Sequence, residues 1–226
     1  MRLLLLGAGK TGSLVADVAR ERRHAVTVFC SAVNRGGSGL TVEALRDVDA
    51  VIDFTTPHAV LDNITACLSA GKPMVVGTTG WYEAIPAVKT LVDKTQTGFI
   101  FGANFSIGLN LFLDIARVGA AALRHGYTGQ VFERHHIHKK DAPSGTAIAI
   151  RNAIHEASGH GLEITSFREG EVVGLHEVVL DSPHDTIYLC HDAKSRHGFA
   201  EGAVRAAEWI ADKKGFYDFK DVWREV

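Results

Sequence analysis

One short segment places three histidines and two lysines directly before a signal for the start of a helix. Ser144 within it is a good helix N-cap, because Pro143 precedes it and an apolar run from Ala147 to Ile150 follows. A helix N-terminus offers free N–H groups and partial positive charge, and imidazole or ammonium groups beside it can supply protons. The segment therefore predicts a site for an anion that must also be protonated. It reads Glu133-Arg134-His135-His136-Ile137-His138-Lys139-Lys140-Asp141-Ala142-Pro143-Ser144-Gly145-Thr146.

The histidines of this segment fall on a predicted strand over residues 130–138. Side chains alternate between the two faces of a strand, so Glu133 and His135 would share one face. Arg134, His136 and His138 would share the other. Zinc needs three or four ligands that converge from one side, and no cysteine lies nearby. We therefore expect no metal in this segment.

A glycine-rich loop lies near the beginning of the chain, between a predicted strand and a predicted helix. Glycines there allow a tight turn and a close approach of the backbone to a pyrophosphate at the helix N-terminus. A plain glycine turn is the alternative. The loop predicts a bound dinucleotide, contacted by Gly7, Gly9, Lys10, Thr11 and Gly12.

The end of the next predicted strand bears on which dinucleotide binds. NAD-specific sites usually place Asp or Glu there for the ribose 2′-hydroxyl, and residues 28–31 contain neither. Ser31, Asn34 and Arg35 could instead contact a 2′-phosphate, unless Arg35 is only a solvated loop charge. The sequence therefore favours NADPH, or the use of both NADPH and NADH.

Apolar runs alternate with helix-like stretches in the N-terminal part of the chain. Runs that are apolar throughout are buried on both faces, which predicts an α/β fold with a doubly wound parallel sheet. The predicted strands are residues 2–6, 25–30, 50–54, 73–76 and 98–101, with helices such as 10–21 and 57–70 between them. Two loops at strand ends, 53–57 and 77–81, lie where such sheets bind ligands. Asp53 either contributes to that site or is only a turn residue.

The pattern changes after residues 104–106. A long amphipathic helix over about 107–125 precedes the strand that carries His135, and a helix over 144–158 follows it. Further strands are predicted over 163–167, 171–180 and 185–191, which indicates an inserted α+β domain. A last helix over 197–212 would return to the first domain. The predicted division is 1–105 plus 197–226 for dinucleotide binding, and 106–196 for the inserted domain.

Composition and charge exclude several classes of function. The formal net charge is −2 and there is no long basic run, so we expect no nucleic-acid partner. The three cysteines are far apart and odd in number, which favours a reducing cytoplasm over a disulfide framework. The apolar opening at residues 3–6 is too short to be a signal peptide or to cross a membrane.

Taken together, the motifs resemble the 4-hydroxy-tetrahydrodipicolinate (dihydrodipicolinate) reductase family over nearly the whole chain. Residues 133–147 match E-x-H-H-x-x-K-x-D-A-P-S-G-T-A. The loops at 53–57 and 77–81 match D-F-[ST]-x-P and G-T-T-G-[FWY], and residues 103–106 match [AP]-N-[FY]-S. The resemblance implies a Rossmann-type domain with an inserted domain for substrate binding and oligomerisation. It also implies a cytoplasmic enzyme that usually forms a homotetramer.

The activity implied by the resemblance is the reduction of 4-hydroxy-tetrahydrodipicolinate to tetrahydrodipicolinate by NADPH or NADH, in the biosynthesis of diaminopimelate and lysine. The substrate is a small cyclic dicarboxylate, reduced as the hydroxylated ring or as its dehydrated form. The catalytic residues would be His135, as the acid, and Lys139, as an acid or orienting group. Lys140 would be a surface residue, and Asp141 would hold Lys139 or only cap the turn.

Binding residues are implied in the same way. The substrate would be bound by His136, Ser144, Gly145, Thr146 and Arg196, although a salt bridge between domains explains Arg196 equally well. Additional contacts to the cofactor would come from Phe54, Thr55, Gly77, Thr79, Ala103, Asn104 and Phe105. The tetramer surface would include Val172, Val173, Val178 and Leu180, unless these face the core.

Two other functions fit parts of the pattern. A metal-assisted hydrolase could be built on the histidine cluster, and stoichiometric metal without affinity for NADPH would indicate it. The second alternative is a sensor that binds a dinucleotide without catalysis. Tight binding of the nucleotide without turnover would indicate it. A sensor needs no proton donors, so the histidines and lysines favour the reductase.

Overall fold

The computed structural model describes residues 1–226, which form two compact units. Unit 1 comprises Met1–Ile107 and His197–Val226, and unit 2 comprises Gly108–Arg196. The chain thus leaves unit 1 after residue 107 and returns at residue 197, compared with 105 and 197 in the division expected from the sequence.

Unit 1 is built on a six-stranded sheet with the strand order β10-β5-β4-β3-β1-β2, in which every neighbouring pair is parallel. The central strands are apolar on both faces, because helices cover both sides. The predicted doubly wound parallel sheet is therefore confirmed. Its strands are β1 (Arg2–Leu6), β2 (Ala25–Phe29), β3 (Ala50–Asp53), β4 (Met74–Val76), β5 (Gly98–Phe101) and β10 (Gly215–Asp218).

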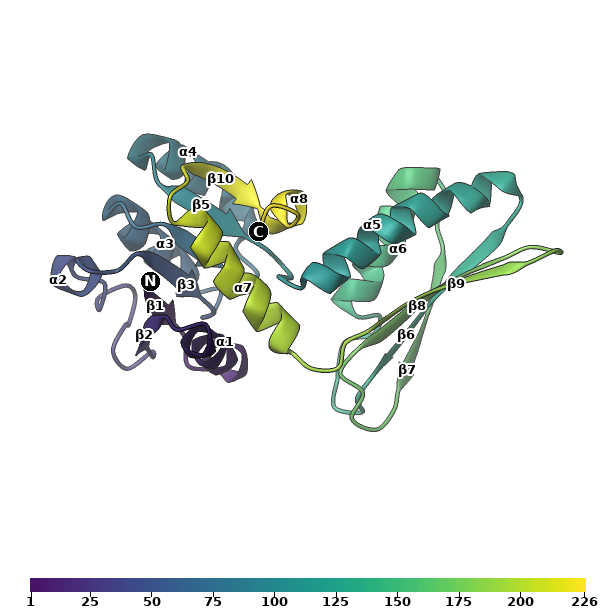
Figure 1. Cartoon of the computed structure of the whole chain (residues 1–226), viewed down its shortest axis with the longest axis horizontal. Helices are drawn as coiled ribbons and strands as arrows, with labels where there is room; N and C mark the ends of the chain where they lie inside the picture. Colours follow the sequence, from purple (N-terminus) through teal and green to yellow (C-terminus); the bar gives the residue numbers. More distant parts are fainter. The chain divides into compact units, whose positions relative to one another are not determined.

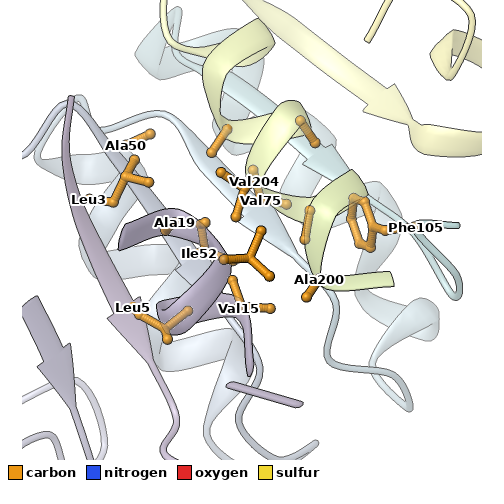
Figure 2. Close-up of a cluster of buried hydrophobic side chains, with 14 of the residues drawn as sticks. Leu3, Leu5, Val15, Ala19, Ala50, Ile52, Val75, Phe105, Ala200 and Val204 are labelled. Atoms are coloured by element: carbon orange, nitrogen blue, oxygen red, sulfur yellow. The ribbon is translucent and has the colours of Figure 1, made fainter. Parts of the chain in front are cut away.

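Helices α1 (Lys10–Glu21) and α7 (His197–Ile210) cover one face of this sheet (Figure 1). Ala200, Val204, Ala207 and Ile210 of α7 are all fully buried, as their helical spacing predicts. Figure 2 shows Ala200 and Val204 packed with Val15 of α1 and side chains of the strands. The other face is covered by α3 (Val60–Ser69) and α4 (Ile85–Thr95). Short helical turns complete the unit: α2 (Val42–Leu45), η1 (Tyr82–Ala84) and α8 (Phe219–Val222).

Strand β10 and helix α8 were not expected from the sequence. Strand β10 has only four residues and pairs along one side, with β5, in the register Gly215↔Gly98 to Asp218↔Phe101. A strand that short carries too few side chains to establish an alternating pattern. Phe219, which follows it, is fully buried in the core beneath α7.

Unit 2 is a four-stranded sheet with the order β7-β6-β8-β9, in which β6 and β7 are parallel and the other pairs are antiparallel. Helices α5 and α6 lie together on one face (Figure 1), and the core of the unit lies between them and the sheet. This is the open α+β sheet that was predicted. Its elements are α5 (Ile107–Gly119), η2 (Ala120–His125), β6 (Thr128–His135), α6 (Gly145–Ser158), β7 (Glu163–Arg168), β8 (Leu175–Asp181) and β9 (Thr186–Asp192).

Strand β6 ends at His135, whereas the sequence predicted a strand as far as His138. The backbone N–H of His136 donates to the carbonyl of Val172, and that of Ile137 donates to Gly170, so the chain turns out of the ladder. The prediction that His136 and His138 share a strand face with Arg134 is therefore wrong. The predicted shared face of Glu133 and His135 is correct, because both lie within the strand and both are buried. Across all of the residues, no helix has the length and apolar character needed to span a membrane.

Candidate active site

Two pockets of about 310 and 400 Å³ lie at the carboxyl ends of β1, β2, β3 and β4, and they share Gly9, Phe54 and Thr55. This is the edge at which open parallel sheets bind ligands. Most of the residues predicted to contact a cofactor line one pocket or both: Gly7, Gly9, Lys10, Thr11, Gly12, Ser31, Phe54, Thr55, Gly77 and Thr79.

The glycine loop is closely packed at its ends and open in its middle. Gly7 has a φ of +102° and an added Cβ would lie 2.2 Å from the carbonyl oxygen of Phe54. A Cβ on Gly12 would lie 2.1 Å from the carbonyl oxygen of Gly7. At Gly9, by contrast, a Cβ would meet nothing within 4 Å. Gly9 lines both pockets, so the loop leaves space at the N-terminus of α1 where a pyrophosphate fits.

Asp53 holds two of the pocket loops together. Its carboxylate is fully buried and accepts hydrogen bonds from the hydroxyls of Thr55 and Thr78, at 2.7 and 2.6 Å, and from the side-chain amide of Asn63 at 2.8 Å. Burial raises the pKa of this carboxyl, against the opposing effect of these hydrogen bonds. Asp53 therefore holds the loops after β3 and β4 in place by buried hydrogen bonds and does not itself face the pockets.

The loop after β2 has no acidic residue at the strand end, as the sequence indicated. Ser31 is exposed and lines the larger pocket, and Arg35 is exposed on the same loop outside the pocket lining. Asn34 differs from expectation. It lines the pocket, but its amide nitrogen donates to Asn63 and its oxygen accepts from the N–H of Gly39. Asn34 is also buried, so its amide serves mainly to hold this loop to Asn63 and Gly39.

The segment before α5 does not line either pocket. Phe105 is buried in the core, where its ring packs edge-on against Phe54 with the ring centroids 6.4 Å apart. The side-chain oxygen of Asn104 accepts the N–H of Ser106 at 2.8 Å, and Ala103 is exposed. Phe105 therefore supports a pocket-lining ring from behind.

A second group of polar residues lies in unit 2, on the face of the sheet that α6 covers. Glu133 is completely buried, and its carboxylate accepts a hydrogen bond from Nδ1 of His135. The other carboxylate oxygen accepts from Arg168 Nη2 at 3.0 Å and from the N–H of Ser144 at 3.3 Å. Burial alone would raise the pKa of the Glu133 carboxyl, but hydrogen bonds from Ser166, Arg168 and His135 outweigh it and lower that pKa.

His135 lies between Glu133 and a second buried histidine, His176 on β8. The two imidazole rings meet edge to face, with centroids 5.1 Å apart. Burial lowers the pKa of His135, and the Glu133 carboxylate offsets part of that effect. Burial also lowers the pKa of His176, to about 4. At neutral pH His176 is therefore an uncharged neighbour of His135.

Lys139 and Asp141 form an ion pair in the loop that follows β6. Lys139 Nζ donates to the Asp141 carboxylate at 2.9 Å, and this contact lowers the pKa of Asp141. Of the two alternatives for Asp141, holding Lys139 is the one seen. Lys140 is exposed, which agrees with its interpretation as a surface residue. His136 is half-buried and its Nδ1 is buried without a hydrogen-bond partner.

Ser144 is the N-cap of α6, as predicted, because its hydroxyl oxygen accepts the N–H of Ala147 at 3.1 Å. The hydroxyl is buried and also lies 3.2 Å from Nε2 of His176. Gly145 is exposed at the first turn and Thr146 is half-buried there, so the free N–H groups of the helix start are accessible. Arg196 is exposed just before α7 and is not part of the cluster around His135.

The cluster contains one set of residues with metal-ligand types that the sequence did not suggest. Ligand atoms of Glu133, His135 and His176 lie within 4.8 Å of one another. The guanidinium of Arg168, however, already bonds Glu133 and puts a positive charge where a cation would bind. The donor set therefore fits an internally satisfied ion pair better than a metal site.

Arg168 and His176 were missed in the sequence analysis, and Glu133 was placed beside His135 there but was given no role. The alternation in β6 was a usable signal for Glu133, since it predicted that Glu133 and His135 share a face. No local pattern pointed to Arg168 or His176. They reach the cluster because β6 pairs with β7 in the register His135↔Arg168 and with β8 in the register Glu133↔His176.

A doubly wound sheet with a glycine-loop pocket, joined to a unit with a buried histidine beside a lysine, defines a two-domain nucleotide-binding oxidoreductase. Comparison with known proteins gives the family. Residues 1–105 match the model for the N-terminus of dihydrodipicolinate reductase, and residues 108–223 match the model for its C-terminus. This chain belongs to the dihydrodipicolinate reductase family, which confirms the resemblance seen in the sequence.

Two of the relatives match over nearly their full length. The 4-hydroxy-tetrahydrodipicolinate reductase of Christiangramia forsetii is 35% identical, covering 100% of this chain and 99% of that protein. The one from Natronomonas pharaonis is 36% identical, covering 98% and 99%. A solved dihydrodipicolinate reductase from Paenisporosarcina sp. TG-14, with bound dipicolinate, has a TM-score of 0.81 at 23% identity, covering 98% and 99%. This last likeness concerns the fold.

Proposed function

We propose that this chain reduces 4-hydroxy-tetrahydrodipicolinate to tetrahydrodipicolinate with NADPH or NADH, in the biosynthesis of diaminopimelate and lysine. The observation that carries the proposal is the buried Glu133–His135 pair next to Lys139, directly before the start of α6, in a chain of this family. The net reaction removes the ring hydroxyl and a hydrogen of the adjacent ring carbon as water, and adds one hydride and one proton to the ring.

The nicotinamide cofactor supplies the hydride. Residues of unit 1 would hold it: the glycine loop at the pyrophosphate, and Thr55, Gly77 and Thr79 farther along the pockets. The structure fits this role because Gly9 borders both pockets and a Cβ there would meet no protein atom within 4 Å, which leaves space for the pyrophosphate. Ser31 and Arg35 are exposed at the end of β2, where a 2′-phosphate would be bound.

The residues of unit 2 would bind the dicarboxylate. One carboxylate fits the N-terminus of α6, where the N–H groups of Gly145 and Thr146 are free of intrahelical partners. His136 would contribute its half-buried imidazole, and Lys139 would contribute a positive charge. Arg196 is exposed and available to the second carboxylate. Ser144 would act mainly through the backbone, since its side chain caps the helix.

His135 would deliver the proton to the ring, and Lys139 would orient the substrate or assist this transfer. Burial keeps the pKa of His135 low, so its protonated form readily gives up the proton.

The proposal is tested by expression in a bacterium that lacks its own reductase and requires diaminopimelate. This chain should restore growth without diaminopimelate, and the His135→Ala variant should not. Failure of the wild-type chain, expressed as folded protein, would contradict the proposal.

We also propose that the chain forms a homotetramer through the face of the unit 2 sheet opposite α5 and α6. Val178 and Leu180 face the core, so they do not supply this surface. The opposite face presents apolar side chains instead: Phe132, Phe167, Leu175, Val179 and Tyr188. Tyr188 is 71% exposed and Phe167 is 43% exposed, which is costly for a sheet left in water.

The assembly is tested by light scattering of the purified protein, whose chain mass is 24.4 kDa. The Tyr188→Lys variant should elute as a smaller species than the tetramer. Val118→Lys is the control, because Val118 is 78% exposed on α5, away from this face. A wild-type protein that elutes as a monomer would contradict the assembly.

We propose the cytoplasm as the location. Cys30, Cys67 and Cys190 are all free thiols, which suits a reducing compartment. Cell fractionation should recover the protein with cytoplasmic markers, and recovery from the periplasm would contradict this location.

A further inference from the structure

The buried carboxylate of Glu133 is fully used by donors of unit 2. It accepts from His135 Nδ1, from Arg168, from the Ser144 backbone and from the side chain of Ser166. A buried carboxylate with this many donors is held in one orientation and stays ionised. It therefore presents a fixed acceptor to the imidazole of His135.

That acceptor determines which nitrogen of His135 carries the hydrogen when the ring is neutral. A carboxylate opposite Nδ1 requires a hydrogen there, so the exchangeable position is Nε2. Nε2 points toward Gly174, where an added Cβ would lie 3.1 Å away. The absence of a side chain at position 174 leaves that edge of the ring uncrowded.

Arg168 connects the same carboxylate to the loop that carries Lys139. Its guanidinium donates to Glu133 and also to the backbone carbonyls of Lys139 and Asp141. The planar fork of an arginine can make these contacts together, which a lysine ammonium cannot do with the same geometry. His135 and the Lys139 loop are thus oriented by one shared ion pair.

We propose that Glu133 is a positioning residue, which holds the Nδ1–H tautomer of His135 so that Nε2 exchanges the catalytic proton, and that Arg168 fixes Glu133 and the Lys139 loop in register. The inference rests on the proposed function for its kinetic consequences, but the tautomer exists in the folded protein with or without substrate.

The charged and titratable groups around His135 determine how its pKa changes when Glu133 is replaced. They are Glu133 on its own strand, Lys139 after it, Arg168 on β7 and His176 on β8. Glu133 is the one negative charge among them, and it favours the imidazolium. Replacing it with a neutral amide leaves the positive neighbours and the burial, so the pKa of His135 falls further. Because the acid form is the active one, the alkaline decline of kcat should move to lower pH.

The test compares Glu133→Gln and Glu133→Asp with Glu156→Gln, a control that is exposed near the C-terminal end of α6. Glu133→Gln should lower kcat by about 10²-fold, the lower end of what general acids contribute, with KM for NADPH unchanged. Its alkaline limb should move to lower pH, and Glu133→Asp should recover part of both effects. Glu156→Gln should match the wild type.

The second readout is the ¹⁵N spectrum of His135 in the folded protein without substrate. The wild type should show the Nδ1–H tautomer, and Glu133→Gln should show a mixture or the Nε2–H form. If Glu133→Gln fails to fold because Arg168 is left unpaired, the double variant Glu133→Gln/Arg168→Gln removes both charges and keeps the comparison open.

The outcomes separate this inference from the proposed function. An unchanged tautomer, or an unchanged kcat and pH profile in Glu133→Gln, would overturn the role of Glu133. A wild-type protein with the Nδ1–H tautomer but no reductase activity would contradict the proposed function and leave the positioning of His135 intact.

Discussion

The carbonyl oxygen of Gly7 lies 2.1 Å from the point at which Gly12 would carry a Cβ. The turn after β1 and the first turn of α1 therefore touch through backbone alone. A side chain at position 12 must displace one of them, whereas a side chain at Gly9 displaces nothing in the protein. Gly12 is therefore required for close packing of the backbone, and Gly9 leaves space for a ligand.

The prediction is that Gly12→Ala destabilises the fold, by about 1–3 kcal/mol as is typical of overpacking. Gly9→Ala should keep the stability of the wild type and weaken NADPH binding by about tenfold or more, since its methyl group enters the pocket. Thermal unfolding and calorimetric titration of the two variants measure these effects. Equal stability of Gly12→Ala and wild type would contradict the packing role, and unchanged affinity in Gly9→Ala would contradict the cofactor site.

Arg35 should distinguish the two nicotinamide cofactors. It is exposed beside Ser31 on the loop after β2, where no acidic side chain selects for NADH. Arg35→Ala should weaken NADPH by about tenfold and leave NADH nearly unchanged, because only NADPH carries a 2′-phosphate. Arg46→Ala, another exposed arginine of unit 1, is the control. Equal effects of Arg35→Ala on the two cofactors would make Arg35 a solvated surface charge.

His135 and His136 should separate by kinetic effect. His135→Ala should mainly lower kcat, by about 10²–10⁴-fold, because a proton donor acts in the transition state. His136→Ala should mainly raise KM, because an anion contact is present in ground and transition states alike. Steady-state kinetics of both variants decide this. Full kcat in His135→Ala would assign the proton to another group.

Two adjacent lysines provide a matched pair. Lys139 is ion-paired with Asp141. Lys139→Ala should affect both kcat and KM, since in the proposed site the Lys139 charge would hold a substrate carboxylate close to the ring. Lys140 is exposed, and Lys140→Ala should behave like the wild type. An inactive Lys140→Ala with a normal Lys139→Ala would place the functional lysine one residue further along.

His176 should make the protein sensitive to acid. Its pKa is about 4 in the fold and about 6.5 in an unfolded chain, so between these values the unfolded chain binds more protons. Its contribution is complete above about pH 6.5 and is lost as the pH falls toward about 4, with a total of about 3 kcal/mol. Burial also lowers the pKa of His135 and His191, which act in the same direction.

The His176 effect is therefore measured as a difference. Denaturant unfolding of the wild type and of His176→Asn, from about pH 7 to about pH 4, should show a smaller loss of stability in the variant. Parallel pH dependences would contradict the assignment to His176.

Local patterns predicted most of the fold. The runs at β1 and β5 were recognised because strands buried on both faces are apolar throughout, and the face of α7 because its buried residues recur at helical spacing. Strand β10 was missed because four residues at a sheet edge show neither signal. The end of β6 at His135 was missed because it depends on hydrogen bonds to residues 170 and 172, far along the chain.

The candidate site was predictable only where its residues are neighbours in sequence. His135, Lys139 and the cap at Ser144 belong to one segment, so their types and spacing carried the prediction. Arg168 and His176 join them through strand register, a long-range property that no single segment encodes. Asn34 shows the reverse case, since its type fitted a phosphate contact but the fold uses its amide internally.

The central claim is reductase activity, and the direct measurement is the oxidation of NADPH or NADH in the presence of freshly made condensation product of aspartate semialdehyde and pyruvate. The purified wild type should oxidise the cofactor only when this product is present, with one cofactor consumed for each ring reduced, and His135→Ala should lose most of the rate. No oxidation of either cofactor by folded wild-type protein with fresh substrate would contradict the account.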